Sequence, residues 1–250
     1  MIKKIGQNFL INEEIARREV DFAKITKDDV VLEIGPGKGI LTNIIASKAK
    51  KVIAIELDTS LYNYLKKTCP DNVHLINDDI LKIDLDSLPK FNKIVSNLPF
   101  QISSPLTFKI IEYNFSVAVL IYQKEFAQRL VAKYGSKHYS RITVNVYYRA
   151  ICKYIQTVPK NCFSPMPKVD SAIIKIQPRK KHPFNVYNEE FYFDLVRNLF
   201  NHRRKKIKTT IRETYDIQAQ DLPFQNNRVE NLDPEQIGRL SNSLFKLLNE

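Results

Sequence analysis

The feature that most constrains the fold is a regular alternation of short β-branched runs with longer helical segments between residues 30 and 121. The runs are Val30–Ile34, Val52–Glu56, Val73–Ile76, Lys93–Ser96 and Val117–Ile121, and the segments with helical spacing are Ile40–Ala49, Ser60–Thr68 and Pro105–Tyr113. Strands that alternate with helices are typical of a parallel sheet covered by helices on its faces. The sequence therefore predicts an α/β fold with a mostly parallel sheet.

The start of the chain predicts one more helix. Asn12 is followed by Glu13 and Glu14, which is the pattern of an N-cap with an acidic first turn. We expect Gly6–Leu10 to be a loop that leads into this helix.

The later part of the chain predicts a second domain. After residue 150, prolines separate what we interpret as two last strands, one of them Val169–Ile176. Ser140–Ala150 is rich in β-branched and aromatic residues but has helical spacing, so its structure stays open. From Glu189 onward the pattern is helical. A chain of 250 residues can hold a large core and a small satellite, so we expect domains at 1–181 and 182–250, the second α-helical.

The first predicted strand leads into Gly35-Pro36-Gly37-Lys38-Gly39, directly before a helix. Glycines at such a turn let the backbone bend sharply and approach a ligand closely. The spacing differs from that of dinucleotide-binding loops, and Glu33 would repel a pyrophosphate more than a sulfonium or an amino-acid group. A tight turn without a ligand is the alternative for this loop taken alone.

Acidic residues follow the next two predicted strands. Glu56 closes the second strand, where a carboxylate can accept hydrogen bonds from both hydroxyls of a ribose. Asp78 and Asp79 follow the third strand, where an acidic side chain could accept from an adenine amino group. Because the carboxyl ends of parallel strands meet at one edge, these sites are expected to converge on one crevice.

The fourth strand ends in Asn97-Leu98-Pro99-Phe100, whose residue types suit methyl transfer to an adenine amino group. The N6 amine is a poor nucleophile because its lone pair is delocalised into the ring. Acceptance of its N–H groups by Asn97 Oδ1 and by a backbone carbonyl beside rigid Pro99 would favour a pyramidal nitrogen. Phe100 offers a face on which an extruded base can stack. An ordinary turn after a strand is the alternative for the tetrapeptide in isolation.

The net charge of +12 lies almost entirely in one stretch. Residues 122–181 hold 13 Lys and Arg against 2 Asp and Glu, compared with 16 against 15 before this stretch and 10 against 10 after it. This excess indicates a polyanionic partner such as nucleic acid, with a solvated lysine-rich surface as the alternative. We expect Lys133, Lys137 and Arg141 to contact RNA.

A second basic cluster lies in the otherwise neutral last third of the chain. We expect Arg203, Arg204 and Lys205 to contact RNA phosphates; a helix face balanced by nearby acidic residues is the alternative. Phe163, next to rigid prolines, is expected to form the opposite wall of the base pocket.

The cysteines and histidines predict no further chemistry. Cys69, Cys152 and Cys162 are far apart and form no C-x-x-C pair, so neither a disulfide nor a zinc site is expected. The four histidines lack metal-ligand spacing, and we assign no metal. The chain has no signal-like start and no apolar run of membrane-spanning length. We expect a cytoplasmic protein, a monomer, without a membrane partner.

Taken together, the motifs resemble those of the ribosomal RNA adenine N6-dimethyltransferase family. They are Gly6–Leu10, Glu33–Gly39, Glu56, Asp79-Ile80 and Asn97–Phe100, in the family's order along the chain. The resemblance implies a Rossmann-like class I methyltransferase domain with a small α-helical C-terminal domain, and S-adenosyl-L-methionine as methyl donor.

The resemblance also implies a role for each matching residue. Asn8 and Leu10 would line the cofactor entrance, and Gly35 and Gly37 would pass the methionine part. Glu56 would hold the ribose and Asp79 the adenine, while Asn97 touches both cofactor and target base. Phe100 departs from the tyrosine of many relatives, which removes a hydroxyl contact and keeps the stacking face.

Two branches of the family act on different RNAs. Tyr122–Leu130, Phe163–Val169 and Leu199–Lys206 resemble the branch that dimethylates two adjacent adenines near the 3′ end of small-subunit rRNA, closest to its archaeal and eukaryotic members. The expected partner is this rRNA in a pre-ribosomal particle during ribosome biogenesis. The alternatives are a large-subunit rRNA methyltransferase, a DNA adenine methyltransferase and a non-catalytic small-subunit assembly factor.

Overall fold

The computed structural model describes residues 7–218 and 221–249, and its chain divides into two compact units. The first unit consists of residues up to Ala127 together with Ile151–Pro178. The second consists of Gln128–Ala150 together with the chain from Arg179 onward.

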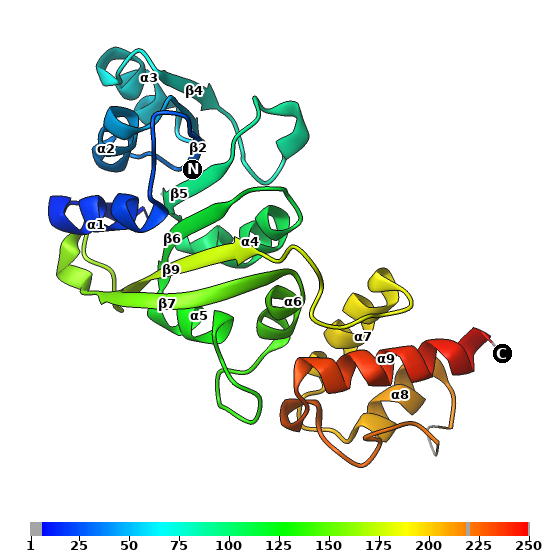
Figure 1. Ribbon diagram of the computed structural model, residues 1–250. Helices are drawn as coiled ribbons and strands as arrows, with labels where there is room; N and C mark the ends of the chain where they lie inside the picture. Colours follow the sequence, from blue (N-terminus) through cyan, green and yellow to red (C-terminus); the bar gives the residue numbers. More distant parts are fainter. Residues whose placement is uncertain (1–6, 219–220, 250) are drawn as a thin grey trace. The chain divides into compact units, whose positions relative to one another are not determined.

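The first unit is built on a seven-stranded sheet in the order β4-β3-β2-β5-β6-β9-β7 (Figure 1). The strands are β2 (Val30–Ile34), β3 (Lys51–Glu56), β4 (Val73–Asn77), β5 (Lys93–Asn97), β6 (Val117–Gln123), β7 (Ala150–Val158) and β9 (Ser171–Pro178). The neighbouring pairs from β4 to β6 are parallel, and β9 pairs antiparallel with β6. This arrangement confirms the predicted α/β class, since buried runs of Val and Ile suit strands covered on both faces.

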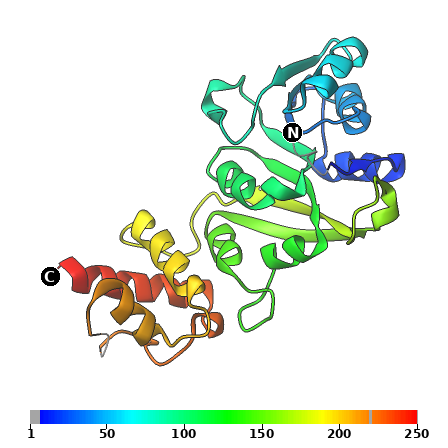
Figure 2. The same ribbon diagram turned by 180° about the vertical axis from the view of Figure 1, so that it is seen from behind.

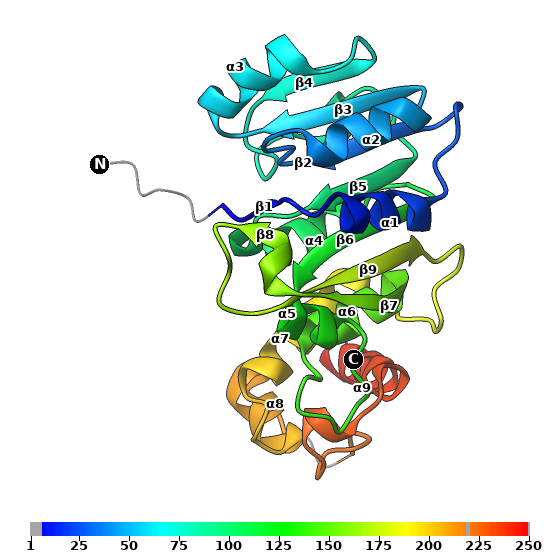
Figure 3. The ribbon, with the colours of Figure 1, turned by 90° about the vertical axis from the view of Figure 1, so that its left-hand side faces the viewer.

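Helices cover both faces of this sheet. On one face lie α1 (Glu13–Ala23), α2 (Ile40–Lys48) and α3 (Thr59–Thr68), and on the other lies α4 (Ser103–Ile111) (Figures 2 and 3). The short helices η1 (Leu85–Ser87), η2 (Phe100–Ile102) and η3 (Lys160–Cys162) lie in connections, and α5 (Lys124–Leu130) follows β6. The Asn12 side chain accepts a hydrogen bond from Ile15 N at 3.0 Å, which confirms the predicted N-cap of α1.

One prediction for the first unit is wrong at the N-terminal end. Phe9–Leu10 is not a loop but a short strand, β1, that pairs antiparallel with β8 (Phe163–Ser164). Nothing local signals this strand, because its partner lies more than a hundred residues away along the chain. Gly6 lies outside the described residues.

The second unit is helical and has its own core. Its elements are α6 (Arg141–Arg149), α7 (Glu189–Asn201), α8 (Ile207–Tyr215), η4 (Val229–Asn231) and α9 (Pro234–Asn249). Val144 and Tyr148 of α6 are buried in this core with Tyr192, Leu195 and Leu240. The ambiguous segment 140–150 is therefore mostly helix.

The division of the chain differs from the predicted domains 1–181 and 182–250. The chain leaves the first unit at Pro178, close to the predicted boundary, but residues 128–150 belong to the second unit. The reason is the apolar face of α6, whose buried side chains complete the second core. Among the described residues, no helix is long and apolar enough to cross a lipid bilayer.

The close packing of α9 gives a testable prediction. A Cβ atom on Gly238 would lie 2.5 Å from the Phe184 ring, far inside van der Waals contact. Alanine normally stabilises a helix interior relative to glycine by about 0.5–1 kcal/mol, whereas overpacking costs typically about 1–3 kcal/mol. We expect Gly238→Ala to lower the free energy of unfolding by about 1–2 kcal/mol.

Denaturant-induced unfolding, followed by circular dichroism, measures this change. Ser243→Ala on the same helix serves as the matched control and should leave the stability unchanged or slightly raised. A Gly238→Ala protein as stable as the parent would show that the Phe184 ring moves aside without cost.

Candidate active site

The sheet opens between β2 and β5, and this opening positions the candidate site. Paired register between these two strands covers only Val31 with Lys93 and Leu32 with Ile94. Beyond this point the Ser96 hydroxyl takes the place of the backbone ladder: Ile34 N donates to Ser96 Oγ at 2.8 Å, and the hydroxyl donates to Ile34 O at 2.5 Å. The two strand ends are thereby held apart by a side chain, at the position where the strand order reverses and where open α/β sheets bind ligands.

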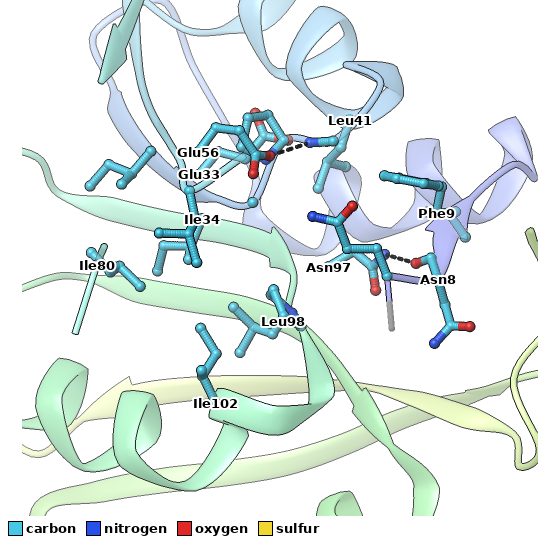
Figure 4. Close-up of a pocket in the computed structure, with 18 of the residues that line it drawn as sticks. Asn8, Phe9, Glu33, Ile34, Leu41, Glu56, Ile80, Asn97, Leu98 and Ile102 are labelled. Carbon is cyan, nitrogen blue, oxygen red and sulfur yellow. Dashed lines mark hydrogen bonds between the residues drawn. The ribbon is translucent and has the colours of Figure 1, made fainter. Parts of the chain in front are cut away.

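A pocket of about 440 Å³ lies at these strand ends (Figure 4). It brings together all ten residues that the sequence predicts for cofactor binding and catalysis, namely Asn8, Leu10, Gly35, Gly37, Glu56, Asp79, Asn97, Leu98, Pro99 and Phe100. Apolar neighbours such as Ile34, Ile80 and Ile102 complete the wall. The predicted convergence of several strand ends on one crevice is therefore found in the structure.

The glycine loop has the backbone that its composition predicts. Gly35 and Gly37 have φ values of +69° and +59°, a region that side chains with a Cβ rarely adopt. A Cβ on Gly37 would lie 2.9 Å from the Phe9 ring, and one on Gly35 would lie 3.4 Å from Pro99. The loop therefore needs glycine both for its turn and for close contact with the two segments that cross it.

The Glu56 side chain holds the glycine loop in its conformation. One carboxylate oxygen accepts from Gly37 N at 3.1 Å, and the other accepts from Asp58 N at 2.9 Å. The side chain is buried, and burial raises the pKa of its carboxyl group in spite of these two hydrogen bonds. Each carboxylate oxygen has a second lone pair, so Glu56 can still accept from the hydroxyls of a ligand.

Asp79 and Asp78 reach the pocket from the loop after β4. Asp79 is half-buried, and one of its carboxylate oxygens accepts from Leu81 N at 3.0 Å, which orients the group. Ile80, the next residue, is buried and lines the same pocket. A polar acceptor beside an apolar surface suits a flat heteroaromatic ring that carries an amino group.

The amide of Asn97 is held in one orientation. Its Nδ2 donates to the backbone carbonyl of Asn8 at 3.3 Å (Figure 4). Its Oδ1 is buried and has no hydrogen-bond partner among the described residues. A buried acceptor without a partner costs about 1–3 kcal/mol, so this oxygen is an acceptor that a bound molecule can satisfy.

Two further carboxyl groups are buried behind the glycine loop. Burial raises the pKa of Glu33 to about 8, and the nearby charge of Glu56 contributes to this rise. Glu19 on α1 is fully buried, and burial together with the charge of Glu33 raises the pKa of its carboxyl group well above the usual value. Burial therefore favours the protonated, uncharged form of both carboxyl groups, which disfavours negative charge behind the glycine loop.

Some contributors to the pocket were not predicted. Ser96 is a fully buried polar residue in β5, and a serine directly before Asn97 was the signal in the sequence that could have revealed it. The Phe9 ring packs on Gly37 and carries the Lys38 ammonium at 5.4 Å from its centre. This contact depends on the β1–β8 pairing, which the local sequence does not predict.

The residues predicted to contact RNA have different surroundings. Lys133, Lys137, Arg204 and Lys205 are exposed, and Arg141 is half-buried. Lys205 forms an ion pair with Glu213 at 2.7 Å. These six residues, Arg203 included, lie in the second unit.

Two of the predicted RNA contacts have other roles in the structure. Phe163 is 2% exposed in the core of the first unit and is not among the residues that line the pocket. A ring buried this deeply is not available for stacking on a base. The Arg203 guanidinium is occupied by Glu230 and by the carbonyls of Ser136 and Lys137. Its position is therefore explained by contacts within the protein.

Among the described residues, no group of three or more His, Cys, Asp and Glu side chains is placed to hold a metal ion.

Comparison with known proteins gives a consistent result. A family model described as ribosomal RNA adenine dimethylase matches residues 2–246. The probable ribosomal RNA small subunit methyltransferase A of Methanococcus aeolicus is 43% identical, over 99% of this chain and 98% of its own length. The protein of the same description from Methanosarcina acetivorans is 44% identical, over 96% of this chain and 93% of its own.

Solved structures give the same picture. A dimethyladenosine transferase from Plasmodium falciparum superimposes with a TM-score of 0.81 at 31% identity, covering 95% of this chain and 98% of that one. The 23S rRNA methyltransferase ErmE superimposes with a TM-score of 0.71 at 26% identity, covering 95% of this chain and 100% of that one.

The buried carboxyl group of Glu33 gives a testable prediction about pH. A carboxyl group whose pKa is raised by folding binds its proton more tightly in the folded than in the unfolded chain. Its contribution to stability is therefore complete below the usual pKa of 4.5 and is lost as the pH rises to about 8. We expect the free energy of unfolding to fall over this range, and to fall less steeply in Glu33→Gln.

Denaturant unfolding at a series of pH values measures the slope. Glu14→Gln, which changes an exposed carboxylate on α1, should follow the parent curve. If Glu33→Gln and the parent had the same slope, the Glu33 carboxyl group would be ionised in the folded protein.

Proposed function

This chain belongs to the ribosomal RNA adenine dimethylase family, and we propose that it transfers methyl groups from S-adenosyl-L-methionine to N6 of two adjacent adenines near the 3′ end of small-subunit rRNA. The product would be N6,N6-dimethyladenosine at both positions. We further propose that the reaction takes place on a pre-ribosomal particle, in the cytoplasm.

The observation that carries the proposal is the fixed amide of Asn97. With Nδ2 held by the Asn8 carbonyl, Oδ1 is the atom that remains for a substrate, and it is already buried and desolvated. An adenine amino group that donates to this oxygen would satisfy it. The next residue, Leu98, supplies a backbone carbonyl whose direction is restricted by Pro99.

These two acceptors would activate the amine without removing a proton from it. Hydrogen bonds from both N–H groups favour a pyramidal nitrogen, whose lone pair then points away from the ring and toward the methyl donor. Asn97 is therefore an orienting group and not a base. Most of the rate enhancement would come from alignment in a site that excludes water.

Phe100 suits the role of stacking face for the target base. It is half-buried at the start of η2 and lines the pocket beside Asn97. Stacking of a base on an aromatic ring contributes roughly 1–3 kcal/mol. This would offset part of the cost of taking the adenine out of its RNA stack.

The pocket fits S-adenosyl-L-methionine, which when bound supplies a methyl group on a positively charged sulfonium. Glu56 has free lone pairs for two ribose hydroxyls, and Asp79 beside Ile80 suits the adenine ring. The positive-φ turns at Gly35 and Gly37 leave room for the amino-acid part. Asn97, whose Oδ1 has no partner among the described residues, and Phe100 line the same pocket, where donor and target would meet.

The choice of RNA rests on the relatives. Those at 43% and 44% identity over almost the whole chain are described as small-subunit methyltransferases. The likeness to the 23S rRNA methyltransferase ErmE, at 26% identity, makes large-subunit rRNA the second candidate. The exposed lysines and arginines of the second unit, among them Lys133, Lys137 and Arg204, support an RNA substrate in either case.

Replacement of Asn97 tests the proposed reaction. We expect Asn97→Ala to lower kcat for methyl transfer roughly 100- to 1000-fold, in line with the loss of one preorganised hydrogen-bonding group in other active sites. Mass spectrometry of rRNA from unmethylated small-subunit particles, incubated with protein and donor, counts the methyl groups on each adenine. Asn114→Ala is the matched control and should act as the parent does.

Three outcomes are informative. Two adjacent adenines with two methyl groups each support the proposal as stated. Methylation of large-subunit rRNA alone would move the protein to the second candidate. If the protein bound the particle tightly but methylated no RNA, it would be a small-subunit assembly factor without catalytic activity.

Replacement of Glu56 tests the donor site separately. Hydrogen bonds to a charged group contribute about 1.5–3 kcal/mol each, so we expect Glu56→Ala to weaken binding of S-adenosyl-L-methionine at least tenfold. Isothermal titration calorimetry measures the dissociation constant in the absence of RNA. Glu112→Ala, which removes an exposed carboxylate after α4, should bind the donor as the parent does; an unchanged constant in Glu56→Ala would exclude Glu56 as the ribose acceptor.

A further inference from the structure

The connection between α5 and α6 is held in one conformation by the second unit. The backbone turns back on itself where Ser136 N donates to the Lys133 carbonyl at 3.2 Å, and the Ser136 hydroxyl donates to the same carbonyl at 2.6 Å. Gly135 has a φ of +76° and donates its N–H to the Glu230 carbonyl at 2.6 Å. After the turn, the Tyr139 ring is buried, and its hydroxyl donates to the Leu232 carbonyl at 2.8 Å.

The Arg203 side chain holds this connection, residues 131–140, in place. Its Nη2 donates to the Ser136 carbonyl at 3.0 Å and its Nη1 to the Lys137 carbonyl at 3.1 Å. Its Nε donates to a Glu230 carboxylate oxygen at 2.8 Å. A planar guanidinium can reach three acceptors at fixed angles, whereas an ammonium cannot reproduce this geometry. Arg203 thus ties the loop to η4 in a way that its charge alone does not explain.

The side chains at the tip of this clamped loop point outward. Tyr134 is 57% exposed, although a ring of this size is usually at least half-covered in a folded protein. Lys133 and Lys137 on either side of it are exposed as well. The segment 128–150 has five basic side chains and no acidic one, so its surroundings in sequence offer no local counter-charge.

We propose that the Tyr134 ring is a stacking platform for an unpaired base or a ribose of the RNA. Lys133 and Lys137 face the adjoining phosphates. Arg203 is a positioning residue that holds the loop carrying Tyr134 in place. The proposal rests on the function proposed above, in that its partner is the same rRNA. An exposed aromatic ring between two cations matches single-stranded RNA in both its flat bases and its charged backbone. A loop already fixed before binding loses little entropy when the RNA docks.

The test uses the full chain, with binding to unmethylated small-subunit particles and to isolated small-subunit rRNA measured side by side. Loss of one stacked base corresponds to roughly a 5- to 150-fold weaker complex. We expect this loss for Tyr134→Ala with both RNA probes, with KM for the particle raised by the same factor. Both kcat and the dissociation constant of S-adenosyl-L-methionine should stay unchanged. Tyr134→Phe should bind as the parent does, because stacking needs the ring and not the hydroxyl.

Tyr187→Ala is the matched control. Tyr187 is 68% exposed in the same unit, but it precedes the acidic pair Glu189 and Glu190. Its removal should leave RNA binding unchanged. If Tyr134→Ala bound both probes within twofold of the parent, the platform would be excluded. If it weakened binding to particles only, the contact would be with a protein of the particle, which also overturns the proposal.

The role of Arg203 is separated from a direct phosphate contact by a charge-preserving change. We expect Arg203→Lys to weaken RNA binding at least as much as Tyr134→Ala does, and the double variant to be no weaker than Arg203→Lys alone. Near-parental binding by Arg203→Lys, or additive effects in the double variant, would show that Arg203 acts on the phosphates by its charge.

Stability and activity readouts keep the outcomes distinct. Thermal unfolding shows whether the second unit stays folded in Arg203→Lys. If that variant unfolds, the variants at the exposed residue Tyr134 still show whether its ring contacts RNA. If the parent protein methylated no RNA, the proposed function would fail, while the binding series would still establish whether Tyr134 contacts RNA.

Discussion

The active site depends on one hydroxyl group that replaces a stretch of β-ladder. At their amino ends, β2 and β5 are joined by a network in which Asp29 accepts from Asn92 and from Lys93. At their carboxyl ends the backbones have separated, and Ser96 bridges them through Ile34. A continuous ladder would have closed the crevice, and a gap without Ser96 would have left the buried polar groups of Ile34 without partners, at a cost of about 1–3 kcal/mol each. The glycine loop and Asn97 both emerge from this held-open end, which explains why they face the same pocket.

Much of this arrangement could be predicted from the sequence, because the signals were local. The β-branched runs, the glycine turn and the acidic residue at the end of a strand each depend on a few neighbouring residues, and parallel topology then brings the strand ends together. The position of Phe163, the strand at Phe9–Leu10 and the role of Arg203 were not predictable in this way. Each depends on a partner far along the chain, and composition alone does not distinguish a basic side chain that clamps a loop from one that faces solvent.

The basic stretch 122–181 illustrates the same limit. Its charges are divided between the two units, and several have structural partners: Arg149 pairs with Glu189, and Lys175 Nζ donates to the Phe22 carbonyl. The basic side chains that remain exposed for a partner are therefore fewer than the excess of basic over acidic residues suggests. Net charge therefore indicates the chemical class of the partner, while the hydrogen bonds indicate which cations are available to it.

The pairing of β1 with β8 has a consequence for the order in which the protein becomes active during synthesis. The carbonyl that orients Asn97 belongs to Asn8, near the start of the chain, and the strand that holds this segment down is Phe163–Ser164. During synthesis on the ribosome, the segment that contains Asn8 and β1 is made early, but β1 cannot pair until β8 has left the exit tunnel. A nascent chain therefore carries the glycine loop and Asn97 without an oriented amide, and the machinery for methyl transfer is completed only when the first unit is nearly whole.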